Sequence, residues 1–195
     1  VLCHIEGGNL RNAIPREASA IIGVPKNEKE KIRVDLNLFH SIIEEELSAV
    51  EPNMKITMES EEHQDRCIDR QTTFALINAL YACPHGVISM SRDIPGLVET
   101  STNLASVKMV GEDQIVVATS QRSSVESLKQ EIACRVESVF TLAGAVATHG
   151  EGYPGWKPNL KSEILNIAVA AYEELYHVTP EVKAIHAGLE CGLFL

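Results

Sequence analysis

The apolar positions along the chain follow two periods, one typical of strands and one typical of helices. Residues 54–58 alternate apolar and polar side chains, a period of two that predicts a half-buried strand. Asn27 and Glu30 have the spacing of a helix N-cap, and apolar residues then recur at helical spacing as far as Val50. The same patterns predict strands at residues 2–6, 18–24, 54–58, 87–90, 98–109, 114–119, 143–148 and 181–185. They predict helices at residues 27–50, 71–82, 123–139 and 164–176, with a further helix starting at about residue 188.

The order of these elements favours an α+β fold with mainly antiparallel sheets and helices packed on one face. Gly111 and the two acidic residues after it predict a hairpin turn, and Ser123 with Glu126 predicts a capping box for the following helix. A doubly wound parallel sheet requires a regular strand–helix alternation, which the consecutive strands in residues 86–119 interrupt. The polar connection at residues 59–70 suggests a division into two ferredoxin-like sub-domains.

Length and charge exclude several classes of protein. A chain of 195 residues corresponds to one domain or two small ones. Its 27 acidic residues against 17 basic ones argue against nucleic acid as a partner, because phosphate would be repelled. No apolar run has the ~18–20 residues of a membrane-spanning helix.

The cysteines indicate where in the cell the protein lies, and the chain ends indicate the extent of the polypeptide. Five widely spaced cysteines without a Cys-x-x-Cys pair indicate reduced thiols in a cytoplasmic protein. The chain starts at Val1 in a strand-like run and stops within the apolar residues 192–195, so we expect it to be part of a longer polypeptide.

The most metal-like cluster is His63 and Asp65, preceded by Glu61 and Glu62. These residue types are zinc ligands, and an independent metallohydrolase using Glu62, His63 and Asp65 is one hypothesis. The alternative is a solvated loop, because the cluster lies in a polar stretch with no apolar frame to orient the ligands. The sequence contains neither a nucleophile elbow nor a phosphate-binding loop.

Three further positions are candidates for substrate binding. Arg122 lies between a strand and a helix start, where it would bind a carboxylate or else pair with Glu126. Asn103, in a polar patch of a strand, would hydrogen-bond a substrate or support a β-bulge. Gly188 allows close backbone approach to a ligand, or simply a tight turn.

Four segments together resemble the aminoacyl-histidine dipeptidases, a branch of the co-catalytic zinc exopeptidases. Residues 7–18 (GGNLRNAIPREA) are similar to the Gly-Gly…Asn-x-Ile-Pro segment of the wider family. Residues 186–194 (HAGLECGLF), 152–158 (GYPGWKP) and 100–104 (TSTNL) are similar to segments of the dipeptidase branch. The resemblance runs in order along nearly the whole chain.

This resemblance implies an enzyme with two zinc ions in a catalytic domain and an inserted α+β lid, or dimerisation, domain. Residues 1–180 would be the lid, with 59–70 as the place where it would divide, and residues 181–195 would be the return into the catalytic domain. The family's zinc ligands would lie outside this chain, which would hold no metal and be inactive alone. The family reaction is attack of zinc-bound hydroxide on a peptide carbonyl, so the implied substrates are Xaa-His and related dipeptides.

Within the lid, the resemblance assigns substrate-binding positions. Arg122 matches an arginine that binds the substrate's C-terminal carboxylate, and Asn103 a substrate-facing position. Gly188 and Glu190 match the segment that re-enters the catalytic domain near the substrate. The partners implied are the catalytic domain, a dipeptide and a second copy in a homodimer. The alternative is a free-standing ferredoxin-like module that binds a ligand or dimerises without catalysis.

Overall fold

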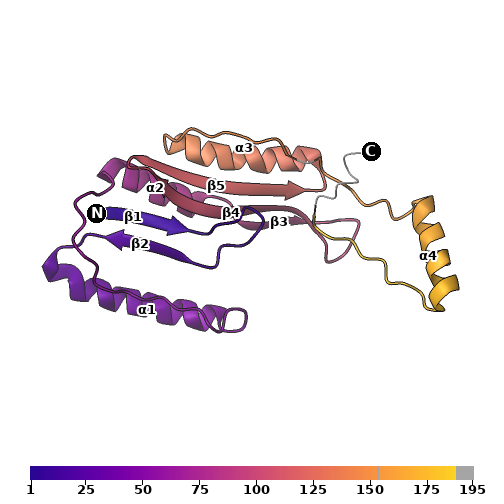
Figure 1. The fold of residues 1–195 in the computed structure, drawn as a ribbon, viewed down its shortest axis with the longest axis horizontal. Coiled ribbons are helices and arrows are strands. Elements are labelled where there is room, and N and C mark those ends of the chain that lie inside the picture. The colour runs from indigo at the N-terminus through magenta and orange to yellow at the C-terminus, as the bar shows by residue number, and fades with distance from the viewer. Residues whose placement is uncertain (153, 188–195) are drawn as a thin grey trace.

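We describe the fold from a computed structural model, which describes residues 1–152 and 154–187. These residues form an α+β structure with a five-stranded antiparallel sheet (Figure 1). The strands are β1 (Leu2–Gly7), β2 (Ala18–Ile22), β3 (Gly86–Met90), β4 (Val98–Val110) and β5 (Gln114–Ser123). The helices are the short 3-10 turn η1 (Lys26–Glu28), α1 (Lys29–Leu47), α2 (Arg70–Ala82), α3 (Glu126–Leu142) and α4 (Glu163–Tyr176).

Strand β4 is the centre of the sheet because it pairs along both edges. On one edge β5 runs antiparallel, from Ser123 opposite Thr100 to Gln114 opposite Val110. Gly111, at φ 63°, turns the chain between them, which confirms the predicted hairpin. The other edge of β4 is divided between β3 near its start and β1 near its end, and β2 extends the sheet beyond β1.

The chain makes a close approach where β1 leaves β4. Gly7 pairs with Val107, and Gly8 follows with φ 62°. A side chain on Gly8 would overlap the carbonyl oxygen of Ala105, so only glycine fits there. In the gap between β1 and β3, the backbone N–H of Leu104 donates to Nδ1 of His85 at 2.9 Å. The His85 side chain thus accepts the hydrogen bond that a neighbouring strand would accept from Leu104 if β1 or β3 extended to this point.

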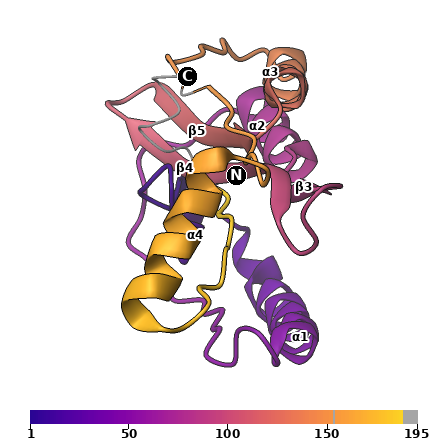
Figure 2. The same cartoon turned by 90° about the vertical axis from the view of Figure 1, so that its right-hand side faces the viewer.

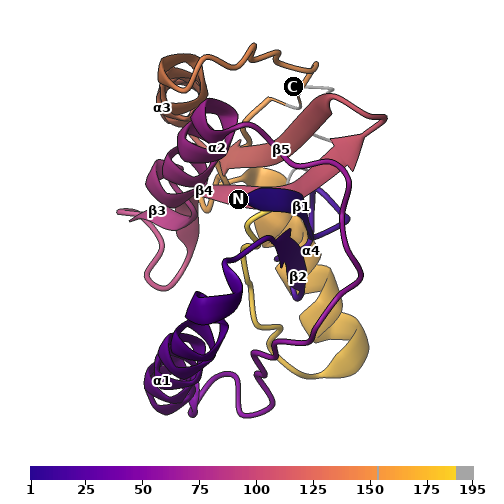
Figure 3. The same cartoon turned by 90° about the vertical axis from the view of Figure 1, so that its left-hand side faces the viewer.

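The core lies between the sheet and the helix pair α2 and α3, which share one face. Figures 2 and 3 show both helices on that face, with α1 and α4 away from it. No residue of α1 or α4 is buried. The buried apolar side chains of α2, α3 and β4 are Leu76, Ala79, Ile132, Val136, Ala105 and Val107. The α+β class and the antiparallel pairing are therefore confirmed.

The expected pair of ferredoxin-like sub-domains is wrong for the part of the chain described. All five strands belong to one sheet, since β4 bonds both to β1 and to β3 and β5. The polar connection at residues 59–70 joins α1 to α2 without regular structure before Arg70. The assignment of residues 1–180 and 181–195 to separate domains stays a prediction.

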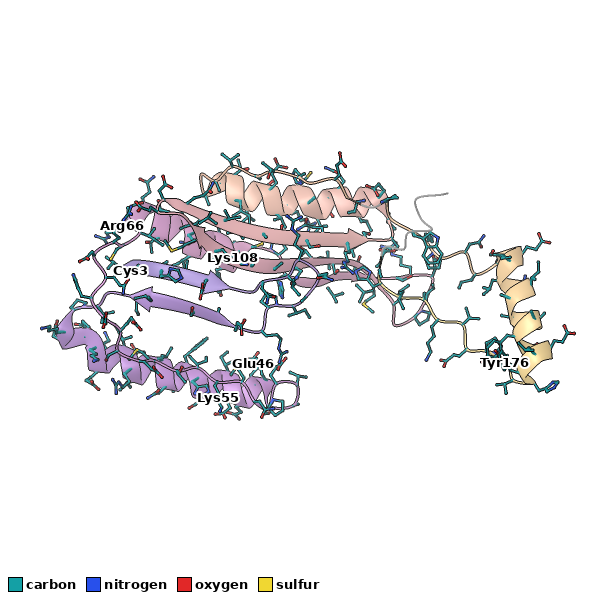
Figure 4. All side chains as sticks on the ribbon, viewed as in Figure 1. Cys3, Glu46, Lys55, Arg66, Lys108 and Tyr176 are labelled. Carbon is teal, nitrogen blue, oxygen red and sulfur yellow. The ribbon has the colours of Figure 1, made fainter. Side chains whose placement is uncertain are left out.

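Three predicted strands are absent from the described residues. Residues 54–58 alternate between half-buried and exposed side chains, as predicted, but have no strand partner. They run back along α1: Figure 4 shows the labelled Lys55 beside this helix, and Lys29 at the helix start donates to the Ser60 hydroxyl at 2.8 Å. Helix α3 ends at Leu142, Gly144 then has φ 80°, and residues 143–148 are irregular, as are residues 181–185. The alternation of apolar and polar residues at 54–58 therefore predicted which side chains are partly buried, but it did not predict whether the backbone pairs with another strand.

Both predicted helix caps are also wrong. Asn27 lies within η1, and no side chain caps α1. Helix α3 likewise begins without a side-chain cap. The Ser123 hydroxyl lies 2.9 Å from the hydroxyl of Thr100 on the adjacent strand, and it accepts from the Val125 N–H. Ser123 is therefore the last residue of β5, and Glu126 has other partners.

Helix α2 has a cap that the sequence analysis missed. The Asp69 carboxylate accepts from the Thr72 N–H at 2.9 Å, and hydrogen bonds from Thr72 lower the pKa of Asp69. We expect Asp69→Ala to lower the Tm by about 2 °C. The folded pKa lies below the unfolded value, so the stabilisation is present above about pH 3.9 and is lost as pH falls through the folded value.

Thermal unfolding between pH 7 and pH 3 tests this cap. Asp69→Asn keeps a capping oxygen and should lose less stability than Asp69→Ala. Asp65→Ala is the matched control, because that carboxylate is 96% exposed and its one ion-pair partner in the described chain is His63. Equal Tm values for Asp69→Ala and Asp65→Ala would contradict the role of Asp69.

Candidate functional site

The candidate site lies on the sheet face opposite α2 and α3. Thr100 and Thr102 are 2% and 3% exposed and face the core. Side chains alternate along a strand, so Ser101 and Asn103 point to the other face. Arg122 is paired with Ser101 across the β4–β5 ladder, which places its side chain on that same face. The fold therefore puts two of the four predicted site residues, Arg122 and Asn103, on one surface.

Arg122 does not form the surface ion pair that was the alternative to carboxylate binding. Glu126 lies 2.8 Å from Lys129 and accepts from the Gly155 N–H at 3.2 Å. These contacts lower the pKa of Glu126, chiefly through the hydrogen bond from Lys129. Within residues 1–152 and 154–187, no carboxylate pairs with Arg122. Arg122 is half-buried, and its guanidinium makes no ion pair with an acidic side chain in the described chain.

His186 is the neighbour that distinguishes this surface. Its Nε2 lies 2.7 Å from the Ser101 hydroxyl, although the two residues are 85 positions apart. Burial lowers the pKa of His186, and the positive charge of Arg122 lowers it further. The imidazole is therefore neutral at pH 7, and it adds a polar contact beside Arg122 without adding charge. Residues 186–194 were apparent as a segment from the sequence, but this contact was not.

The second predicted residue, Asn103, holds the loop between β1 and β2. Its Nδ2 donates to the carbonyl oxygens of Arg11 and Ala13 at 3.1 and 2.7 Å. Its Oδ1 is buried and has no hydrogen-bond partner in the described structure. Asn103 thus fixes the segment that carries the Gly-Gly…Asn-x-Ile-Pro resemblance, and its contact with substrate stays a prediction. Gly188 and Glu190 lie outside the described residues.

The independent metal site proposed from Glu62, His63 and Asp65 is not supported. His63 and Asp65 are 88% and 96% exposed, and their closest approach is 3.8 Å. That hypothesis required burial and clustering, which these side chains lack. Among residues 1–152 and 154–187, no three His, Cys, Asp or Glu side chains form a group able to hold a metal ion. The described side chains are therefore not arranged to hold a metal ion.

The pKa of His186 yields a pH-dependent prediction. Because the folded pKa lies below the unfolded value of about 6.5, the unfolded chain binds more protons. The contribution to stability is present above that pH and is lost as pH falls through the folded pKa. We expect the Tm to fall less between pH 7 and pH 5 in His186→Gln than in the unmodified protein.

NMR titration of His186 is the direct measurement. Arg122→Ala should raise the His186 pKa, since it removes a nearby positive charge. His63→Gln, at an exposed loop position, is the control and should leave the Tm–pH curve unchanged. A His186 pKa that does not respond to Arg122→Ala would show that the two groups are not coupled.

Comparison with known proteins finds similarity over almost the whole chain. The chain is 35% identical over 193 residues to the cytosol non-specific dipeptidase of Escherichia coli strain K12, covering 99% of this chain. It superimposes on the crystal structure of aminoacylhistidine dipeptidase from Vibrio alginolyticus with a TM-score of 0.91 and 36% identity, again over 99% of its length. The resemblance to these dipeptidases is confirmed.

The match has a definite extent. This dipeptidase-like chain spans 40% of the E. coli relative and 39% of the Vibrio chain. The aligned region is therefore less than half of each relative, and the expectation of a longer polypeptide stays a prediction. No family model matches the sequence. In the described part of the chain, none of the helices has the length and apolar character needed to span a bilayer.

Proposed function

We propose that this chain is the lid of a cytoplasmic zinc-dependent dipeptidase acting on Xaa-His and related dipeptides, and that Arg122 binds the substrate's C-terminal carboxylate. The observation that supports this is Arg122 itself. It is half-buried on the open sheet face and has no acidic partner in the described chain, although Glu126 lies four residues away. The likeness to two dipeptidases supplies the reaction class.

The chemistry of the arginine suits a free C-terminus. A guanidinium is planar and permanently charged, and it donates two parallel hydrogen bonds to a carboxylate. Ser101 and neutral His186 lie beside it and add no competing negative charge. The contribution of this chain is thus to bind and orient the dipeptide, while the metal and the general base belong to the rest of the enzyme. Gly188 and Glu190 are proposed to lie near the substrate where the lid rejoins that domain.

A segment exchange tests the proposal. The 195 residues would replace the matching segment of the E. coli dipeptidase, and Gly-His and β-Ala-His hydrolysis would be measured with added Zn²⁺. We expect the chimera to hydrolyse both dipeptides and the chain alone to hydrolyse neither. A folded but inactive chimera would contradict the proposal, as would metal-dependent turnover by the chain alone.

Dimerisation is a second role that one observation favours. Strand β2 is at the end of the sheet, with β1 as its one partner among the described strands. An unpaired strand edge offers backbone groups to another chain. Sedimentation of the chimera and of the chain alone would show whether a homodimer forms. A dimer that binds no dipeptide and supports no hydrolysis would favour the free-standing module instead.

A further inference from the structure

Two cysteines from distant parts of the chain meet at the start of the sheet. The Sγ atoms of Cys3 on β1 and Cys67 in the connection before α2 are 2.6 Å apart, across 64 residues of sequence. Both are free thiols. The sulfur atoms are thus only slightly further apart than the ~2.05 Å of a disulfide bond. Figure 4 shows the labelled Cys3 and Arg66, the neighbour of Cys67, at the same end of the molecule.

Backbone contacts keep these two segments side by side. The Ile68 N–H donates to the carbonyl oxygen of Leu2 at 2.7 Å, so the residues next to both cysteines are hydrogen-bonded. On the far side, Asp69 caps α2 and fixes the end of the connection. The position of Cys67 against β1 therefore follows from the fold on both sides and does not depend on the thiols alone.

The other described cysteines lack this arrangement. Cys83 is 7% exposed, and burial raises its pKa. Cys134 is exposed, but its described contact is a hydrogen bond from Gln130, not a second thiol. Cys67, in contrast, is exposed and Cys3 is partly exposed, so a small oxidant can reach the pair. Cys134 thus serves as an internal reference for a thiol without a partner.

We propose that Cys3 and Cys67 form an oxidation-sensitive dithiol that closes to a disulfide on reaction with a hydroperoxide. In the first step the Cys67 thiol loses its proton, the thiolate attacks an oxygen of hydrogen peroxide, and the O–O bond breaks; the leaving hydroxide takes up the proton, so that a sulfenic acid and one water form. In the second, the Cys3 sulfur attacks the sulfenic sulfur, the S–S bond forms, and a second water leaves. Two thiols are oxidised, and one hydrogen peroxide is reduced to two waters.

The order of the two sulfurs follows from their surroundings. The pKa of Cys3 is raised, first by its hydrogen bond with Cys67 and then by burial. Cys3 therefore keeps its proton near neutral pH, and the exposed Cys67 is the sulfur that an oxidant meets first. Cys3 then resolves the sulfenic acid from within bonding reach. This inference does not depend on the dipeptidase proposal. Gly7 at the end of β1 pairs with Val107, so Cys3 lies toward the β4–β5 turn. Arg122, in contrast, pairs with β4 near the other end of that strand.

The disulfide would have a mechanical consequence. It would close a loop that contains β1, β2 and α1, and α1 has no buried residue to hold it to the rest of the molecule. A cross-link over so long a loop restricts the unfolded chain strongly. We therefore expect the oxidised protein to have a Tm several degrees above that of the reduced protein, and a reductant to reverse the shift.

Peptide mapping by mass spectrometry tests the proposal on the folded protein. After one equivalent of hydrogen peroxide and alkylation, we expect a Cys3–Cys67 cross-linked peptide that has lost two hydrogens and that reappears as two peptides after reduction. This disulfide should be about tenfold more abundant than any disulfide of Cys134, because the second thiol is in place to capture the sulfenic acid as it forms. Cys134→Ser is the matched control and should not change the yield of the cross-linked peptide.

Variants separate the two sulfurs. In Cys3→Ser, Cys67 should accumulate as a sulfenic acid that dimedone traps. In Cys67→Ser, Cys3 should stay largely reduced under the same conditions, because its pKa is raised. The proposal is overturned if native Cys3 stays unlinked while Cys67 is oxidised to sulfenic or sulfinic acid, if only intermolecular disulfides form, or if the Cys3–Cys67 disulfide is no more abundant than disulfides of Cys134.

Discussion

Arg122→Ala is expected to lower kcat/KM for Gly-His hydrolysis by the chimera about 100-fold, mainly through a higher KM. Removing one partner of a charge-assisted pair costs roughly 2–5 kcal/mol when the remaining charge is left without its counterion. The substrate carboxylate does not change during the reaction, so Arg122 binds the ground state and the transition state alike, and kcat should change little.

Three controls isolate the carboxylate. Arg122→Lys keeps the charge but loses the bidentate geometry, so it should recover only part of the activity. A dipeptide amide should be hydrolysed with nearly the same kcat/KM by the unmodified and the Arg122→Ala chimeras. Arg135→Ala is the matched arginine control. This arginine lies on α3 and pairs with Glu131 at 2.6 Å, so its loss should leave kcat/KM unchanged. Equal losses on the free acid and the amide would contradict the role of Arg122.

The same residue shows what a sequence can and cannot predict about a site. The local pattern predicted that Arg122 follows a strand ending at Thr119, but Arg122 lies within β5, which continues to Ser123. Its neighbours were not apparent from the local pattern, because Ser101 faces it only in the register that β4 and β5 adopt, and His186 arrives from 85 residues away. The same holds for Cys3 and Cys67. Contacts between distant segments depend on tertiary structure that no local period records.

The secondary structure also shows that local sequence patterns do not record contacts between distant segments. Helices α2 and α4 and the β4–β5 hairpin were predicted, because helical periodicity and a glycine turn are local signals. Residues 54–58 have the alternation of a strand, but they lie along α1, where alternation needs no hydrogen-bonded neighbour. Ser123 has the spacing of a cap, but it bonds to Thr100 instead. Tertiary partners decided each of these cases.

The largest effect on stability is expected from Ile132→Ala. Ile132 is fully buried on α3, at 0% exposure, in the core that joins this helix to the sheet. Truncation removes apolar contacts and leaves a cavity, at a cost of about 2–5 kcal/mol in the free energy of unfolding. Urea unfolding of the full chain should show this as a lower midpoint with an unchanged slope.

A graded series makes the result specific to packing. Ile132→Val removes one methylene group and should cost about 0.5–1.5 kcal/mol. Val34→Ala on α1 is the control, because that side chain is 64% exposed and should change the stability by less than about 0.5 kcal/mol. A loss below about 1 kcal/mol for Ile132→Ala would mean that α3 does not pack as described.

Since α3 covers the sheet face opposite Arg122, the folded Ile132→Val chimera should keep its kcat/KM for Gly-His. Stability and substrate binding would then be shown to depend on opposite faces of one sheet.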